Sequence, residues 1–593
     1  MIDVSRSKKA FAVAANCMFV AAAIFAAGAT ALRLVMALTL HMWYAFTQRA
    51  DDQLLMSYAS PGYEGSNDRY AMAKNRSYGW FLHFVSWSGL SVDAVYFLLW
   101  LVAALLVAAA IHVYFRSRWL SVFAYLYVLW NPVAFEDWSG TRLYRNSVFA
   151  PVMFILLAGF MLYLSAGTPI NRKYRHTDGE QSKESSSKGP AVAKALLSFV
   201  GHLGTVVLAV LVGDWFVFLY DLKEDSIWLV PILLAVVVIK AVYGLCTAHS
   251  WKKRIVVLML CIAPLLTVYS GIQLIKANNE RSFGVAELNT RTEGELARFI
   301  SFVYILDNPE QDTTIWAPYD SIEAVFHASD TLSHYPDLLT HIEYGGLKSP
   351  SIRQQPLKGD ALSWRLIDAI DKTIGMDDQA AVQRLFAKAN AEIQKAFDSG
   401  ELERTTKITV SESMVPRTRE QIAELIEPAW DYYVNVFQLA HNYQVTWHHN
   451  SSDSNGVNQT GLRQVNIRAD NPNPIVFPWF SFASAQKTVG KLLPIYSGIN
   501  TLLGIALLLS IIATIIVAII RKRWMPLGCL SLALCLEVYG FAYTFFVYWF
   551  SESLNSEYKT FFYMYGPVTA LISMGLLLGI GSFVASICRN LHR

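Results

Sequence analysis

The stretch VDAVYFLLWLVAALLVAAAIHVY, residues 92–114, is an apolar run that is followed, after Phe115, by the basic triplet RSR. A helix of this length crosses the ~30 Å hydrocarbon core of a bilayer, because each residue adds about 1.5 Å. The whole chain has the same character, since 54% of its 593 residues are hydrophobic and only 16% are charged. This composition predicts an integral membrane protein.

About ten such runs fill both ends of the chain and leave a polar middle. The fold class predicted is an α-helical polytopic membrane protein with a mainly helical extracytoplasmic domain. The predicted spans are 12–40, 92–114, 119–135, 148–166, 194–219, 227–246, 255–275, 496–519, 526–548 and 562–587. They divide the chain into an N-terminal transmembrane module with outward catalytic loops, a soluble extracytoplasmic domain and C-terminal transmembrane helices, at 1–276, 277–495 and 496–593.

Lys and Arg collect in alternate loops, as they do on the cytoplasmic side of a membrane. Each basic cluster falls on the same side of the predicted spans: SRSKK (5–9), RSR (116–118), NRKYRH (171–176), WKKR (251–254), RKR (521–523) and RNLHR (589–593). We therefore expect a multi-pass protein of the cell membrane with both termini in the cytoplasm. The first run is too long for a cleaved signal peptide and is followed by the bulky HMWYAF.

The large polar segment 277–495 contains no cysteine, because all six cysteines lie in or beside predicted spans. This excludes an ectodomain held by disulfides and a cysteine-based zinc site there. The net charge of +3 is too small to indicate a nucleic-acid partner. Membrane lipid is the partner that the composition does predict.

The triplet DDQ occurs at 51–53 and again at 377–379. The second copy follows Gly375 and precedes an amphipathic pattern, so we expect its acids to cap a helix. The first copy, with Asp51 and Asp52, lies just outside the first span, where two interpretations remain open. The acids either cap a short surface helix or belong to a chemical site.

Two further outward loops and the end of the first carry charges beside the lipid boundary. Acids next to cations suit a reaction that removes a proton from one substrate and stabilises a phosphate on the other. For any single loop, solvated surface charges are the simpler interpretation. The residues are Lys74 in AKNRSYGWFLHF (73–84), Glu136, Asp137, Arg142 and Arg145 in EDWSGTRLYRNS (136–147), and Asp221, Lys223, Glu224 and Asp225 in DLKEDSIW (221–228).

The order DDQL, RLYR, KEDSIW, followed by a late extracytoplasmic domain, resembles the GT-C class of integral-membrane glycosyltransferases, in particular a group of uncharacterised bacterial members. The resemblance covers roughly 40–235. It implies a polyprenyl-phosphate sugar donor, an acceptor outside the membrane and an acid of the first loop as general base. This chain departs from the pattern at Asn146, where the group carries an acid after YR.

The predicted reaction is a single displacement at the anomeric carbon of the lipid-phosphate sugar by a hydroxyl of a cell-envelope glycan, lipid or protein. Asp51 or Asp52 is the predicted base, and Arg142, Arg145 and Lys223 are the predicted ligands of the donor phosphate. Lys74, Glu136, Asp137, Glu224 and Asp225 are predicted to support them.

No carboxylate and histidine cluster has metal-ligand spacing, so the sequence indicates no metal cofactor, and WHHN (447–450) is the best histidine pair. Asp214 lies inside the fifth predicted span, and we expect it to face the bundle interior. Two other classes remain open. A transporter or lipid flippase would also place charges among its spans, and a non-enzymatic envelope-assembly protein would use 277–495 to bind partners.

Overall fold

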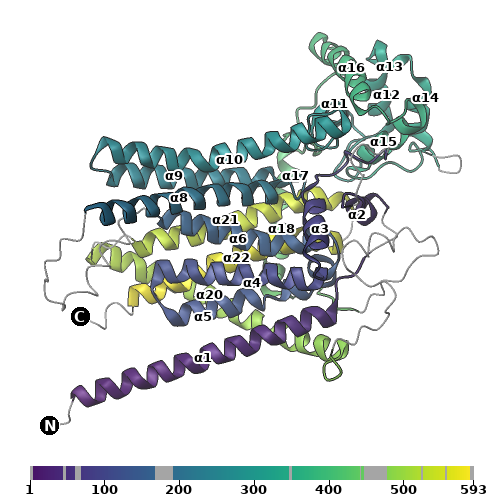
Figure 1. Cartoon of the computed structure of the whole chain (residues 1–593). Coiled ribbons are helices and arrows are strands. Elements are labelled where there is room, and N and C mark those ends of the chain that lie inside the picture. The colour runs from purple at the N-terminus through teal and green to yellow at the C-terminus, as the bar shows by residue number, and fades with distance from the viewer. Residues whose placement is uncertain are drawn as a thin grey trace.

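The computed structural model shows a bundle of long helices with a smaller group of helices at one end (Figure 1). No strand occurs in the described part of the chain, which is otherwise almost entirely helical. The structure describes residues 4–44, 49–59, 68–166, 191–345, 350–440, 443–446, 477–521, 525–554 and 557–587.

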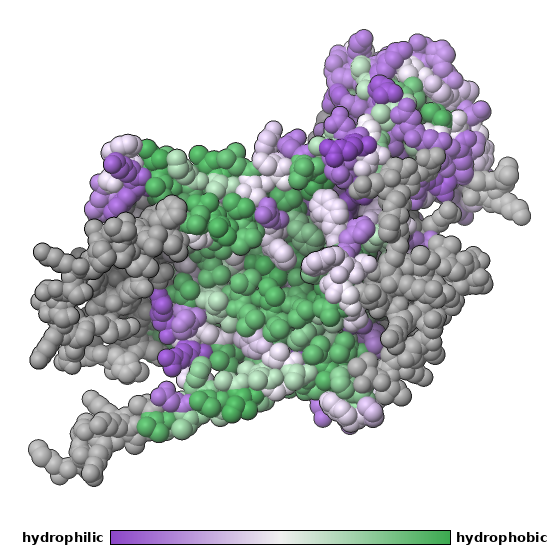
Figure 2. Space-filling model, viewed as in Figure 1, coloured by the Kyte–Doolittle hydropathy of each residue, from purple (hydrophilic) through white to green (hydrophobic). Residues whose placement is uncertain are grey.

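Nine helices among the described residues are long and apolar enough to cross a membrane. Helices satisfy their own backbone hydrogen bonds, which is why long apolar segments adopt them in lipid. Figure 2 shows a continuous hydrophobic surface along these helices. They are α1 (Val4–Leu40), α4 (Val92–Phe115), α6 (Arg145–Ser165), α8 (Ala191–Tyr220), α9 (Leu229–Thr247), α10 (Trp251–Phe283), α20 (Phe482–Arg521), α21 (Met525–Ser551) and α22 (Glu557–Ile587).

The predicted span 119–135 is wrong as a single helix. It consists of α5 (Arg118–Leu129), 12 residues long, and the short 3-10 helix η2 (Pro132–Phe135). Proline has no N–H to continue the α-helical pattern, and the side chain of Asn131 instead accepts a hydrogen bond from the backbone N of Val133 at 3.1 Å. The apolar run is therefore long enough to cross a membrane, but its last turns are not part of the helix.

The three predicted outward loops lie together at one end of the bundle, which we call the loop end. Helices α4 and α5 pack against each other, and the chain returns after α5 to the end where α1 finishes (Figure 1). There the backbone N of Trp43 donates to the carbonyl of Thr141 at 2.9 Å, and the N of Leu143 donates to the carbonyl of Trp43 at 2.7 Å. The first loop and the second are thus joined through their backbones.

A group of amphipathic helices covers part of the loop end. Their apolar faces pack on one another, as in the ring pairs Phe299–Phe386 and Phe302–Phe397, whose centroids lie 5.4 and 5.6 Å apart. The helices are α11 (Gly294–Ile305), α12 (Tyr319–His327), α13 (Asp330–Ser333), α14 (Pro336–Tyr344), α15 (Ala361–Thr373) and α16 (Gln379–Ser399). Trp316, between α11 and α12, joins this group to the bundle, because its ring centroid lies 5.6 Å from that of Phe550 in α21.

The helices that follow α16 do not stay with this group. Helix α18 (Ile426–Gln438), which follows the short α17 (Arg419–Glu424), packs among α20, α21 and α22. The Tyr433 hydroxyl donates to Glu537 at 2.5 Å, and the side chain of Asn500 donates to the carbonyl of Phe437 at 2.7 Å. Part of the predicted soluble domain is therefore in direct contact with the long apolar helices.

The two DDQ triplets have different structural roles. In the second, Asp378 caps α16, and its Oδ1 accepts the backbone N–H of Ala381 at 2.8 Å. This confirms the predicted cap. In the first, Asp51 and Asp52 belong to the π-helix η1 (Arg49–Gln53) and pair with side chains from other segments. The two copies are not one repeated site.

The cap provides a matched pair of variants. Asp378→Ala should lower the free energy of unfolding by ~1 kcal/mol, because it removes an N-cap acceptor. Asp377→Ala should have a much smaller effect, because Asp377 is the exposed residue before the cap. Chemical denaturation of the purified protein measures both, and equal losses would contradict the assignment of the cap to Asp378.

Candidate functional site

The first loop presents its two adjacent acids to two different cations. Successive side chains on the short helix η1 point in different directions, so Asp51 pairs with Lys74 and Asp52 pairs with Arg142. Lys74 lies just before α3 (Ser77–Ser88), and Arg142 lies in the second loop, just before α6. The two acids are adjacent in the sequence, but each forms an ion pair with a different cation.

Asp52 and Arg142 form a closed pair. Nε of Arg142 donates to Oδ1 of Asp52 at 2.9 Å, and Nη2 donates to Oδ2, so the contact is bidentate. Both side chains are buried, and the guanidinium also lies 4.6 Å from the ring centroid of Tyr144 and 5.0 Å from that of Trp138. Burial raises the pKa of Asp52, while the guanidinium opposes this by favouring the carboxylate. This pair joins the two loops and leaves little of Asp52 for a substrate.

Asp51 is the open member of the two acids. Its side chain is 42% exposed, whereas that of Lys74 is 1% exposed. The ammonium of Lys74 donates to Asp51 and to the Tyr144 hydroxyl, the latter at 3.0 Å, and Tyr144 donates to Asp51 at 3.2 Å. Burial lowers the pKa of Lys74 to about 8, although Asp51 partly restores it. Burial works against the charge of Asp51, but Lys74 reverses this and holds the pKa of Asp51 well below its usual value.

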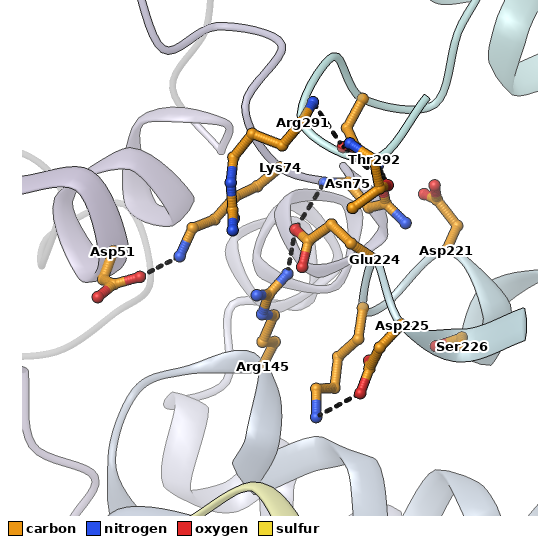
Figure 3. A network of polar contacts seen from close by, with 12 residues as sticks. Asp51, Lys74, Asn75, Arg145, Asp221, Glu224, Asp225, Ser226, Arg291 and Thr292 are labelled. Atoms are coloured by element: carbon orange, nitrogen blue, oxygen red, sulfur yellow. Dashed lines mark hydrogen bonds and ion pairs between the residues drawn. The ribbon is translucent and has the colours of Figure 1, made fainter. Parts of the chain in front are cut away.

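Arg145 and Glu224 connect the start of α6 to the third loop. Nη1 of Arg145 donates to Oε1 of Glu224 at 2.5 Å, and the backbone N of Asn75 donates to the same oxygen at 3.4 Å (Figure 3). Burial favours the neutral form of Glu224, but Arg145 overcomes it and lowers the pKa of Glu224 to about 2. Nε of Arg145 is buried and has no hydrogen-bond partner among the described residues. One donor of this guanidinium is therefore uncommitted.

Lys223 is the least satisfied cation of the cluster. Its side chain is only 4% exposed, and its nearest carboxylate oxygen, on Asp225, lies 3.7 Å away (Figure 3). The ring centroids of Phe149 and Tyr563 lie 5.6 and 5.4 Å from Nζ. Burial lowers the pKa of Lys223, and Asp225 raises it in part. An ammonium in this position favours an additional anion.

Asp221, at the start of the third loop, holds the N-terminus of α3. Its Oδ2 accepts the backbone N and the hydroxyl of Ser77 at 2.9 and 2.7 Å. Its other oxygen, Oδ1, is buried without a hydrogen-bond partner in the described chain. Burial raises the pKa of Asp221 to about 7, although the bonds from Ser77 oppose the shift.

The remaining predicted residues of the second loop have local roles. Oε2 of Glu136 accepts the backbone N–H groups of Trp138 and Ser139 at 3.0 and 2.6 Å, and burial raises the pKa of Glu136 to about 8. Asp137 accepts the backbone N and the hydroxyl of Thr446. These acids hold the loop η3 (Asp137–Thr141) and the segment 443–446 in place.

Sequence reasoning missed the contribution of the segment after α10. Arg291 donates to Asp360 at 2.5 Å, and its guanidinium lies 4.2 Å from the ring centroid of Trp364 on α15. Asn289 donates to Asn75 at 2.8 Å, and Arg291 also contributes to the lowered pKa of Glu224. The polar run LNTRTEGE (288–295), which follows an apolar helix, was the available signal.

Two other predicted features lie outside the cluster. Asp214 is exposed on the side of α8, so the expectation that it faces the bundle interior is wrong. Adjacent residues of a helix point in different directions, and here the neighbouring Gly213 packs against α10 while Asp214 does not face the bundle. Among the described residues, no three histidine, cysteine or acidic side chains are arranged to hold a metal ion, and WHHN lies outside these residues.

Comparisons of the chain with family models, with curated proteins and with solved structures give no match. The chemistry of the site must therefore be argued from its geometry. The partly exposed carboxylate of Asp51 pairs with the buried Lys74 and is also near Arg145. A third buried cation, Lys223, is near Arg145. Carboxylates of this kind can accept a proton, and buried cations can hold an anion.

The raised pKa of Asp221 predicts a pH-dependent stability. The ordinary pKa of an aspartate is ~3.9, so the unfolded chain loses this proton as the pH rises above ~4 while the folded protein keeps it up to about pH 7. The contribution of protonated Asp221 to the stability of the folded protein is therefore full below pH ~4 and is lost as the pH rises through about 7. Asp221→Asn should reduce the fall in melting temperature between about pH 5 and about pH 8.

In Asp221→Asn the fall in melting temperature should be reduced and not abolished, because the raised pKa of Glu136 also lowers stability as the pH rises. Thermal unfolding of the purified protein in detergent at the two pH values measures the effect. An unchanged or steeper fall in Asp221→Asn would contradict the assignment.

Proposed function

We propose that the protein is a membrane glycosyltransferase that moves a sugar from a polyprenyl-phosphate donor to an extracytoplasmic acceptor of the cell envelope. The observation that carries the proposal is the partly exposed carboxylate of Asp51 in a cluster that also contains the buried cations Lys74, Arg145 and Lys223. The resemblance of residues 40–235 to the GT-C class supports the same conclusion. The long apolar helices supply the surface along which a polyprenyl chain would lie.

In the proposed reaction, an acceptor hydroxyl attacks the anomeric carbon of the sugar. The hydroxyl proton passes to Asp51 as the new C–O bond forms, and the bond between the anomeric carbon and the phosphate oxygen breaks. Its electron pair remains on the phosphate, which leaves as polyprenyl phosphate with one more negative charge. Asp51 is ionised at neutral pH and can accept the proton, although Lys74, which holds its pKa well below the usual value, makes it a weaker base.

The contacts assign the cations different tasks. The guanidinium of Arg142 is committed to Asp52. Nε of Arg145 has no hydrogen-bond partner among the described residues, and the carboxylate beside Lys223, on Asp225, is 3.7 Å away. We therefore assign the leaving phosphate to Arg145 and Lys223, and assign Arg142 to holding Asp52. Asp51, and not Asp52, is then the general base.

The proposed setting is the cell membrane, with both termini in the cytoplasm and the loop end outside. The helices α11 to α16 lie beside the site through Arg291, Asp360 and Trp364, which suits recognition of the acceptor. The proposed partners are the polyprenyl-phosphate sugar, the envelope acceptor and membrane lipid.

Cells that lack the protein should accumulate the lipid-linked sugar, which mass spectrometry of lipid extracts detects. The wild-type gene should remove this excess. Asp51→Asn should fail to remove it while the folded protein is still present, because loss of a positioned base lowers a rate ~10²–10⁴-fold.

The neighbouring acid is the matched control. Asp52→Asn leaves the buried guanidinium of Arg142 without its partner and should cost about 3–5 kcal/mol of stability, so it should lower the amount of folded protein. Absence of any lipid-linked sugar in the deleted cells, or normal function of Asp51→Asn, would contradict the transferase and favour a transporter or an assembly protein.

The phosphate role is best tested at Lys223. Lys223→Gln should weaken the binding of polyprenyl phosphate by about 1.5–3 kcal/mol, or ~10 to ~150-fold, because one charge-assisted hydrogen bond is lost. Arg145→Gln is less informative, since it also leaves the buried Glu224 without its partner. Titration of the purified protein with polyprenyl phosphate gives the affinity.

Lys276→Gln is the control for charge alone. Lys276 also lies near the loop end, but its ammonium is already bonded to Glu287 and Glu293 at 2.8 Å each. Its replacement should leave the affinity unchanged. Equal affinities of Lys223→Gln and the wild type would remove the support for a phosphate at this position.

A further inference from the structure

Helix α3 crosses the ends of the long helices instead of running along them (Figure 1). Both of its ends are fixed. Ser77 at its start is bound by Asp221, and Gly89 after its last residue has a left-handed backbone with φ +68°. Ser91 then caps α4 by accepting the backbone N–H of Ala94 at 3.3 Å. The orientation of α3 is therefore determined by its neighbours.

One face of α3 is aromatic and exposed. Trp80, Phe84 and Trp87 are spaced by four and three residues, which places them in one stripe on a helix. Their exposed fractions are 37%, 52% and 82%, and the rings of Phe84 and Trp87 lie 5.9 Å apart. The opposite face, with residues such as Leu82 and Val85, is buried against the protein.

The exposed surface of α3 also has a polar side. His83 and Ser86 are exposed and lie next to the aromatic stripe around the helix. A helix with large aromatic rings on one side of its exposed surface and polar groups on the other is stable at the interface between lipid and water.

The aromatic stripe is continuous with the surface that faces lipid. Helix α4 begins four residues after α3 ends, and its exposed Leu98, Val102 and Leu105 form a similar stripe along the bundle. Figure 2 shows pale residues at the position of α3, between the hydrophobic belt of the bundle and the hydrophilic helices at the loop end. Tryptophan is typical of this position in membrane proteins.

Exposed aromatic and aliphatic side chains mark both ends of the bundle. Trp479, before α20, and Ile227, in the third loop, are exposed at the loop end. Trp119, at the start of α5, and Trp251, at the start of α10, are exposed at the opposite end. Two such girdles are expected where a bundle passes through the two headgroup layers.

We propose that α3 lies within the headgroup layer of the leaflet at the loop end, with Trp80, Phe84 and Trp87 inserted among its phospholipids and with His83 and Ser86 toward water. The occupant of the stripe is membrane lipid. This placement does not depend on the transferase proposed above.

The placement has a direct consequence for the polar cluster. Lys74 and Asn75 lie immediately before α3, and Asp221 binds its first residue. The depth of α3 therefore sets the depth of the cluster, and it puts Lys74 at the level of lipid phosphates. If the transferase proposal holds, a donor anchored by its polyprenyl chain presents its phosphate at that same level.

Spin labelling of the full chain in vesicles tests the placement. A nitroxide is attached at Phe84→Cys, Trp87→Cys or Ser86→Cys, in a background without the native cysteines. The vesicles contain equal parts of phosphatidylethanolamine and phosphatidylglycerol. Oxygen concentrates in lipid and a nickel chelate remains in water, so the ratio of the two accessibilities reports the depth of each label.

The label at Phe84 or Trp87 should have an oxygen-to-nickel ratio severalfold higher than the label at Ser86. The three positions lie on one helix, so a loss of folding would affect all three labels alike. Circular-dichroism spectra of the three labelled variants in detergent should be the same, which checks that each is folded. Equal ratios at the three positions would overturn the proposal. Exclusion of both reagents from Phe84 and Trp87 would also overturn it, because it would show a protein partner, such as a second copy of the chain, on the stripe.

Discussion

The buried pair of Asp52 and Arg142 fixes the geometry on which the polar cluster depends. A bidentate contact between a carboxylate and a guanidinium tolerates little change in orientation, and a buried ion whose partner is removed is strongly destabilising. The pair therefore holds η1 against the second loop, and the backbone contacts of Trp43 with Thr141 and Leu143 reinforce it. With Asp52 held inward, the adjacent Asp51 is directed toward Lys74 and remains partly open.

The other ion pairs of the cluster also join residues from different segments of the chain. Arg142 is neutralised by the first loop, Arg145 by the third loop and Arg291 by the segment before α15. Each buried ion is costly alone, so these segments stabilise one another only when the complete bundle has formed. Lys223 is the exception, because its carboxylate partner is distant and half exposed. Lys223 therefore has less compensating charge than Lys74, Arg145 and Arg291, and an anionic ligand would gain most there.

The membrane helices were predictable because hydropathy is a local property of the sequence, and the cap at Asp378 was predictable for the same reason. The short α5 was missed because its apolar run continues through Pro132, and hydropathy does not record where a proline ends a helix. The charged loops were identified, but their pairings were not. Asp52 and Arg142 are 90 residues apart, and Asn75 and Asn289 are 214 apart, so only the fold brings them together. Arg291 was overlooked because the polar run around it shows that the segment is exposed to polar surroundings but does not show which segments it contacts.

Helix α18 constrains the order in which this chain is completed. It precedes α20, α21 and α22 in the sequence, yet these are the helices on which it packs. During synthesis from the N-terminus, Tyr433 emerges about a hundred residues before Glu537. The aromatic face of α18 therefore lacks its final contacts until α20, α21 and α22 have been synthesised and have entered the membrane. A ribosome that stops before α21 leaves α18 unsatisfied, which makes this helix a natural point of recognition for the machinery that removes incomplete membrane proteins.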